Sequence, residues 1–303
     1  MAFKPAKFLD PKSDLVFKRI FGQNTDLLIS FLNGVMPFKE GGFIETVSYL
    51  PAEQTPRIPT LKNTIVDVKC TDQSGRICIV EMQMSWSASF TKRLLFGVSK
   101  AYVQQLDSGK DYVTLCPVYG LGIINEVFDR STEEWFHHYR TVNIKDTNKV
   151  LEGLELVFLE LPKFKPQTLE HRKMGVLWLR FLREINEKMV DVPQEFMDSP
   201  ELNKAMELAQ ESSYTTAELE AYDKYWDAVR VEKTLAVDSF QEGKSEGIEI
   251  GKAEGKAEGK AEGKAEGRSE EKIAMVKSLL QEGASLDMVA KVSGLPREQI
   301  EKI

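Results

Sequence analysis

Apolar side chains recur every three or four residues along several stretches of the chain, which is the spacing of one face of an amphipathic helix. The first of these stretches has Ser13 or Asp14 as a candidate N-cap and Gly22 as a candidate stop. A later stretch carries Trp178 on its apolar side, and we expect that side to be buried in the core. The pattern predicts helices over residues 10–22, 24–34, 90–106 and 168–185.

Other stretches are short, almost wholly apolar and rich in β-branched residues, which is typical of buried strands. Residues 65–84 contain two such runs around a turn, and further strands are predicted within 112–128 and 154–164. Two or three strands, then a helix, then another strand indicate an α/β fold in which helices cover the faces of a central sheet.

Beyond residue 200 helical patterns dominate, and they include the repeat GKAEGKAEGKAEGKAEG. Glycine recurs at every fourth position from Gly243 to Gly267, and each glycine costs a helix about 1 kcal/mol. One interpretation is a solvated linker or a weak single helix. The other is a stripe of small residues through which two copies of the chain pair as a homodimer.

Residues 269–303 have the spacing of short helices separated by Gly283 and Gly294, with Ser285 as a cap and Pro296 at the start of the last helix. This spacing resembles a helix-turn-helix. The last predicted helix lacks the cluster of Arg, Lys and Asn that would read bases, so a small oligomerisation or docking unit is an equal alternative.

Composition narrows the class of protein. The chain has 303 residues, of which 42% are hydrophobic and 9% aromatic, and this is enough for a globular core. No apolar run reaches the roughly 18 residues of a membrane span, and the first residues lack the apolar stretch of a signal peptide. The three cysteines, Cys70, Cys78 and Cys116, have no paired spacing for zinc. We expect a reduced, cytoplasmic protein without membrane contact.

The net charge of −7 argues at first against a nucleic-acid partner. Residues 1–120 hold 14 Lys and Arg against 11 Asp and Glu, a net of +3, whereas the remainder holds 26 against 36, a net of −10. The acidity therefore belongs to the C-terminal part, and the mildly basic N-terminal part permits contact with DNA.

Two acidic residues, Asp67 and Glu81, interrupt the apolar runs of the hairpin, and their relative placement depends on the turn between them. A two-residue loop, Ser74-Gly75, would put the two carboxylates on opposite faces of the sheet. A three-residue loop that adds Gln73 would put them directly opposite each other. We favour the longer loop, because Gly75 supplies the left-handed conformation that its third position requires.

In the three-residue register the two acids face each other with Cβ atoms about 4.5–5.5 Å apart, where like charges are destabilising unless a cation compensates them. Mg²⁺ favours one or two carboxylates together with water and phosphate oxygens. Gln83 points the same way as Glu81 and can orient a water or a phosphate. The alternative is a solvated face on which the acids pair with Lys69 or Lys92.

A strand with Asp, a turn, and Glu-x-Gln on the next strand resembles the core of the PD-(D/E)XK nucleases. The stretches KSDLVFKRIFG, VDVKCTDQSGRICIVEMQM, RLLFGVSKAYVQQL, GKDYVTLCPV, LELVFLELPKF and SGLPREQIEKI, together with the repeat, resemble the Rpn family of recombination-promoting nucleases and transposases. The resemblance spans nearly the whole chain and is specific as an ensemble. It implies a restriction-endonuclease-like core, with a mixed sheet flanked by helices, and a helical C-terminal extension.

The resemblance implies hydrolysis of DNA phosphodiester bonds that depends on Mg²⁺ or another divalent cation. Asp67 and Glu81 would hold the metal, joined by the backbone carbonyl of Met82. Gln83 stands where many superfamily members have a catalytic lysine, and a neutral amide can hydrogen-bond but carries no charge.

Three cations are candidates for the missing positive charge and for phosphate contact, and Arg93 is preferred over Lys69 and Lys92. Asp14 is a candidate for a further carboxylate, although a helix cap is its simpler interpretation. Tyr102 follows Arg93 on the same predicted helix but does not share its stripe.

The expected organisation is a nuclease-like core over 1–165, a helical extension over 166–240, the repeat over 241–268 and a small helical tail over 269–303. The first functional hypothesis is a metal-dependent DNA endonuclease acting in recombination or on mobile elements. The alternative is a catalytically degenerate nuclease fold that binds DNA or protein partners. The three histidines, His137, His138 and His171, are expected to be surface residues without partners.

Overall fold

The computed structural model describes residues 7–38, 42–51, 53–54, 64–65, 67–106, 111–166 and 173–303. The chain divides into two compact units, Met1–Lys233 and Thr234–Ile303. Helix α7 (Thr216–Gln281) begins in the first unit and continues through most of the second.

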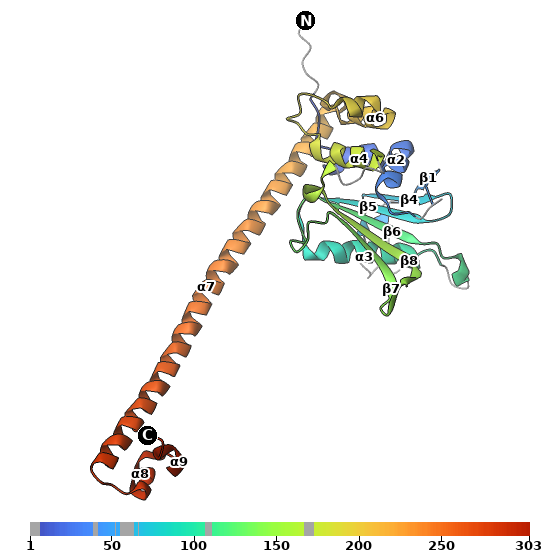
Figure 1. Ribbon diagram of the computed structural model, residues 1–303. Coiled ribbons are helices and arrows are strands. Elements are labelled where there is room, and N and C mark those ends of the chain that lie inside the picture. Colours follow the sequence, from blue (N-terminus) through green and yellow to red (C-terminus); the bar gives the residue numbers. More distant parts are fainter. Residues whose placement is uncertain are drawn as a thin grey trace. The chain divides into compact units, whose positions relative to one another are not determined.

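A six-stranded sheet with the strand order β1-β4-β5-β6-β8-β7 forms the centre of the first unit (Figure 1). Strands β5, β6 and β8 are parallel to one another, and the other neighbours pair antiparallel. This mixed sheet confirms the expected fold class. The strands are β1 (Val47–Tyr49), β4 (Val68–Asp72), β5 (Ile77–Gln83), β6 (Val118–Ile124), β7 (Phe136–Asn143) and β8 (Asp146–Glu160), and a separate pair is formed by β2 (Glu53–Gln54) and β3 (Thr64–Ile65).

Helices cover both faces of the sheet because alternate strand residues point to opposite sides. Cys78 and Val80 of β5 belong to the core shared with α1, α2, α4 and α6, whereas Ile77 and Ile79 belong to the core shared with α3. The helices of this unit are α1 (Asp14–Phe21), α2 (Thr25–Val35), α3 (Ala88–Val103), α4 (Lys173–Glu184), α5 (Gln194–Asp198), α6 (Pro200–Ala209) and the start of α7.

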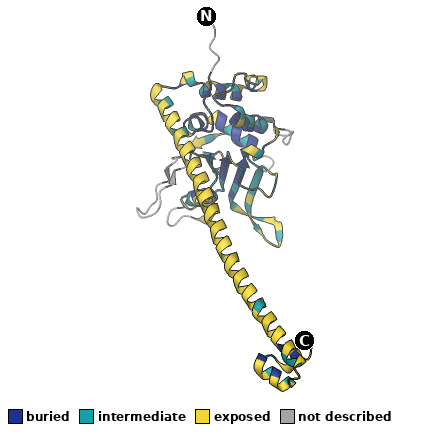
Figure 2. Ribbon diagram, turned by 90° about the vertical axis from the view of Figure 1, so that its left-hand side faces the viewer, coloured by how far each residue is buried: buried dark blue, intermediate teal, exposed yellow. Residues whose placement is uncertain are grey.

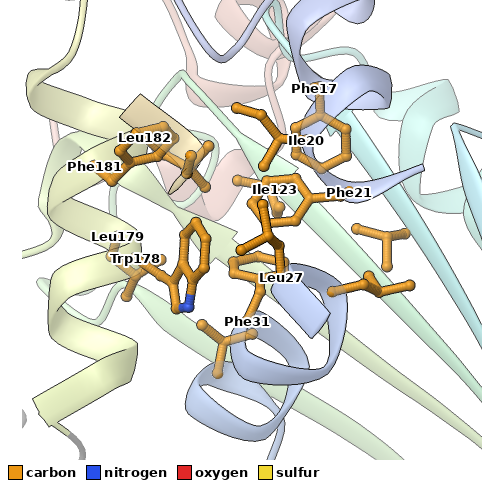
Figure 3. Packing of buried hydrophobic residues seen from close by; sticks show 14 of the residues in the cluster. Phe17, Ile20, Phe21, Leu27, Phe31, Ile123, Trp178, Leu179, Phe181 and Leu182 are labelled. Atoms are coloured by element: carbon orange, nitrogen blue, oxygen red, sulfur yellow. The ribbon is translucent and has the colours of Figure 1, made fainter. Parts of the chain in front are cut away.

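The larger core is built around aromatic rings from α1, α2 and α4 (Figure 3). The ring centroid of Trp178 lies 5.2 Å from that of Phe21 and 6.0 Å from that of Phe31. Its indole nitrogen donates a hydrogen bond of 3.0 Å to Ser30 Oγ, so the polar atom of this buried side chain is satisfied. The expectation that Trp178 is a core residue is confirmed.

The first helix has the ends expected from its sequence. Ser13 is its N-cap and accepts a hydrogen bond from the backbone N–H of Val16, while Asp14 is the first helical residue, and Gly22 ends the helix. The second helix does not stop at Gly34 but continues to Val35. Gly34 has a packing role instead, since it lies against Gly175 of α4.

Strand β7 was not expected from the sequence, because its partly exposed residues lack a long apolar run. It pairs with β8, where His137 Nε2 lies 2.8 Å from Glu160 Oε1 and His138 Nε2 lies 2.7 Å from Glu155 Oε2. The expectation that these two histidines are surface residues without partners is therefore wrong, since each reaches a buried carboxylate. His171 lies outside the described residues.

Two predicted strands have different bounds in the structure. Within 112–128 only Val118–Ile124 is extended as strand β6, because a 3-10 turn over Tyr112–Thr114 precedes it. Strand β8 is longer than the predicted 154–164 and begins at Asp146, where a turn joins it to β7.

The second unit ends in a small helical cluster formed by the end of α7, α8 (Leu286–Ser293) and α9 (Arg297–Ile300). Its core holds the buried residues Val276, Val289 and Ile300. The repeat is helical throughout, and its residues are exposed except for the partly buried Gly267 (Figure 2). None of the helices in the described part of the chain combines the length and the apolar character that crossing a membrane requires.

Two glycine-to-alanine substitutions are expected to have opposite effects. A Cβ atom on Gly175 would lie 2.2 Å from the carbonyl oxygen of Gly34, so Gly175→Ala forces α2 and α4 apart and lowers the free energy of unfolding by about 3 kcal/mol. A Cβ atom on Gly255 would meet nothing within 4 Å. Because alanine favours the helical conformation more than glycine, Gly255→Ala raises the local stability of α7 by about 1 kcal/mol. Urea unfolding followed by circular dichroism measures both, and equal stability of Gly175→Ala and the wild type would contradict the packing argument.

Candidate active site

The register of the β4–β5 hairpin is set by a three-residue loop, as expected. Gly75 has a φ of 80°, and the backbone N–H of Asp72 donates a 3.0 Å hydrogen bond to the carbonyl of Arg76. The ladder pairs Val68 with Val80. Extended by one residue, this register puts Asp67 opposite Glu81.

The carboxylate of Asp67 is held at the end of β4 by contacts from two directions. Its Oδ2 accepts a 2.7 Å hydrogen bond from the backbone N–H of Met82, and its Oδ1 lies 3.8 Å from Lys18 Nζ on α1. Burial raises the pKa of the Asp67 carboxyl to about 7, with a smaller rise from the nearby carboxylates of Asp14 and Glu81. The hydrogen bond from Met82 opposes this rise without cancelling it.

Glu81 is more deeply buried, with 5% of its surface exposed. Its Oε2 lies 3.5 Å from Arg93 Nε on α3, whereas its Oε1 is buried and has no hydrogen-bond partner among the described residues. Burial raises the pKa of this carboxyl, and the charge of Arg93 lowers it in part. An unpartnered buried carboxylate oxygen is costly, and such atoms often mark the place of an ion or a water.

Gln83 lies at the end of β5, and both the nitrogen and the oxygen of its side-chain amide form hydrogen bonds. Its Nε2 donates to the carbonyl of Ser85 at 2.9 Å, and its Oε1 accepts from Arg93 Nη2 at 2.6 Å. Helix α3 can approach the sheet this closely because Gly122 of β6 has no side chain. A Cβ there would lie 3.0 Å from the ring of Phe90.

These side chains line one cavity of about 490 Å³ at the end of β5. Helix α1 contributes one carboxylate, α3 contributes the guanidinium, and α7 contributes three side chains at a helical spacing. The lining residues are Asp14, Asp67, Glu81, Met82, Gln83, Met84, Arg93, Tyr225, Val229 and Glu232.

The structure thus brings Asp14, Asp67, Glu81, Gln83 and Arg93 together with Met82 around one cavity. The other candidates from the sequence lie elsewhere, and the lining formed by the described residues does not include them.

Lys69 lies half-buried on β4, where burial and the charge of Lys100 lower its pKa. Lys92 is exposed on α3. Tyr102 lies beside β8, where a Cβ on Gly153 would come within 3.3 Å of its hydroxyl.

Four residues at the site were not found from the sequence. Lys18 binds Asp14 at 2.7 Å, one helical turn away. Tyr225, Val229 and Glu232 come from the start of α7. Their spacing of four and three residues is a weak signal of a shared helical face, but the sequence does not say what that face contacts.

The donor set at the cavity suits a hard divalent cation. No group of three or more His, Cys, Asp or Glu side chains in the described part of the chain is arranged to hold a metal. Two carboxylates, a backbone carbonyl and water are nevertheless a sufficient set for Mg²⁺, which keeps several of its waters. The unpartnered Oε1 of Glu81 is the observation that such an ion would explain.

A family profile described as PD-(D/E)XK nuclease family transposase matches residues 11–235. The chain therefore belongs to the PD-(D/E)XK nuclease family transposases, and the expected family resemblance is confirmed. No curated protein and no solved structure matches the chain significantly. Membership supports a function related to nucleases and transposases, with DNA as the substrate of the family.

The raised pKa of Asp67 predicts a pH-dependent stability. The folded state holds this proton more tightly than the unfolded chain, so the carboxylate destabilises the fold increasingly as the pH rises from about 4 to about 7. In buffer free of divalent cations, Asp67→Asn should therefore be more stable than the wild type at about pH 8, by roughly 1 to 3 kcal/mol, and the gain should shrink at about pH 5.

Urea unfolding at the two pH values measures this difference. Asp26→Asn is the matched control, because Asp26 is exposed and its hydrogen bond to Lys204 lowers its pKa, which predicts a small loss of stability instead. A gain for Asp67→Asn that is larger at the lower pH would contradict burial as the dominant effect.

Proposed function

We propose that this chain is a metal-dependent DNA endonuclease that hydrolyses phosphodiester bonds in recombination or mobile-element biology. The observation that carries the proposal is the unpartnered, buried Oε1 of Glu81 beside the carboxylate of Asp67 in one cavity. A catalytically inert binding protein has no need to keep an unsatisfied carboxylate in such a place, because a neutral or apolar side chain would be more stable there.

Nucleases of this superfamily generally use divalent metal ions. Asp67, Glu81 and the backbone carbonyl of Met82 would hold the ion, and Asp14 lines the same cavity. A bound divalent cation would lower the pKa of a water ligand and neutralise charge on the phosphate.

The protein itself contributes orientation, charge and a confined volume. Asp67 is fixed by the N–H of Met82, and Arg93 presents a cation beside Glu81. During hydrolysis a bond forms between a water oxygen and phosphorus, and the bond from phosphorus to the leaving sugar oxygen breaks. The water gives up one proton, and the leaving oxygen takes up one, so that the step balances. The positive charge of Arg93 stabilises the charge that develops on the phosphate oxygens.

A second candidate function is supported by one observation. Gln83 is neutral where many members of the superfamily have lysine, which favours a catalytically degenerate nuclease fold that binds DNA or a protein partner. The two functions differ in their dependence on the carboxylates, because binding without cleavage does not require Glu81.

Cleavage assays with purified protein, plasmid DNA and Mg²⁺ separate these functions. Asp67→Asn and Glu81→Gln are expected to reduce the cleavage rate on the order of 10²- to 10³-fold, because each replaces a carboxylate that would hold the divalent cation with a weakly binding amide. Asp26→Asn, an exposed carboxylate on α2 outside the cavity lining, should cut like the wild type. Wild-type protein that cuts no faster than Glu81→Gln would rule out the endonuclease.

Metal binding can be measured without DNA. Titration calorimetry of the wild type with Mg²⁺ should show binding that Glu81→Gln weakens by about tenfold or more, because a neutral amide is a poorer ligand than a carboxylate. Asp26→Asn again serves as the control. Equal affinity of Glu81→Gln and the wild type would remove Glu81 from the metal site.

A further inference from the structure

Gln83 is held in a way that a lysine could not be. Its Oε1 accepts a 2.6 Å hydrogen bond from Arg93 Nη2, and its Nε2 donates to the carbonyl of Ser85. A lysine ammonium has three donors and no acceptor, so at this position it could not accept a hydrogen bond from a guanidinium and would repel it. The amide is therefore chemically matched to the arginine rather than a neutral remnant of a lysine.

Arg93 is fixed on three sides. Besides its bond to Gln83, its Nε lies 3.5 Å from Glu81 Oε2, and its guanidinium lies over the ring of Phe90 at 5.1 Å from the centroid. Nearly half of its side chain, 47%, remains exposed. A guanidinium has five N–H donors, so these contacts leave donors free to bind a phosphate oxygen in the cavity.

The other cations near the site are less suitable sources of charge. Lys18 is bound to Asp14 at 2.7 Å, and the cavity lining formed by described residues includes neither Lys69 nor Lys92. Among the lining residues in the described part of the chain, Arg93 is the one basic side chain.

We propose that Gln83 is a positioning residue for Arg93, and that Arg93 contacts the phosphate in place of the lysine that many related enzymes carry on the strand. The positive charge at the site is therefore carried by Arg93 on α3 instead of by a lysine on β5. The Gln83 amide on β5 fixes the orientation of the Arg93 guanidinium. This inference rests on the proposed nuclease function for its catalytic part, but the contact between Arg93 and phosphate can be tested without cleavage.

Gln83→Lys tests the pairing of the amide with Arg93. Restoring the common motif should reduce cleavage rather than increase it, because the new ammonium faces the guanidinium of Arg93. We expect a fall in kcat of about tenfold or more for Gln83→Lys, with a change in KM of less than about threefold, and a fall in kcat/KM of about 100-fold for Arg93→Gln. The exchanged double variant, Gln83→Lys with Arg93→Gln, should recover to within about tenfold of the wild type, since the amide and the cation have only changed places.

Binding of a short fluorescent DNA duplex in EDTA gives a readout that does not depend on catalysis. Arg93→Gln should weaken this binding about fivefold or more and reduce its dependence on salt concentration, whereas Lys204→Gln, which removes an exposed charge on α6, should change it by less than about twofold. Urea unfolding of every variant checks that loss of binding or rate is not loss of fold.

The outcomes separate the two proposals. If the wild type does not cleave DNA but Arg93→Gln weakens duplex binding, the endonuclease is wrong and the role of Arg93 in phosphate contact stands. If the wild type cleaves and Gln83→Lys is faster than the wild type, the pairing of Gln83 with Arg93 is overturned while the endonuclease stands. Wild-type binding and cleavage by Arg93→Gln would also overturn the inference.

Discussion

The pairing of β4 with β5 is the constraint on which the site depends. Because side chains alternate along a strand, a shift of one residue in this register would move one carboxylate to the opposite face of the sheet. The loop that ends at Gly75 fixes the register, and Asp72 supports it through hydrogen bonds to Ser74 and Arg76. A local turn conformation thus decides whether Asp67 and Glu81 meet.

The buried carboxylates of the site lower the stability of the folded state. Burial raises the pKa of both acidic groups, and one oxygen of Glu81 lacks a partner among the described residues. A buried carboxylate without compensation is expensive, so the surrounding core must supply the difference. The aromatic cluster of Phe21, Phe31 and Trp178 belongs to the larger core on one face of the same sheet.

The parts of this arrangement that are local in sequence could be predicted. The loop type followed from Gly75, the first helix followed from Ser13 and Gly22, and the burial of Trp178 followed from the spacing of its neighbours. The parts that depend on distant segments could not. Glu232 reaches the cavity from the start of α7, about 150 residues away from Glu81 in the sequence. The histidines of β7 find partners because β8 lies beside them. The spacing of residues along the chain does not say which distant segment either group contacts.

Helix α7 has regions of very different local stability along one continuous hydrogen-bonded element. Its first turns are hydrogen-bonded to the loop before α1. The hydroxyl of Tyr222 accepts a hydrogen bond from the backbone N–H of Asp10, and the hydroxyl of Tyr225 donates one to the carbonyl of Lys12. From Gly243 to Gly267 every fourth residue is a glycine at which an added Cβ would meet nothing within 4 Å, and each of these glycines weakens the helix by about 1 kcal/mol. Amide hydrogens in the repeat can therefore exchange with solvent through local opening, while the turns that form the cavity wall stay protected. The fraying of the repeat and the integrity of the site are thus energetically separate, although one helix carries both.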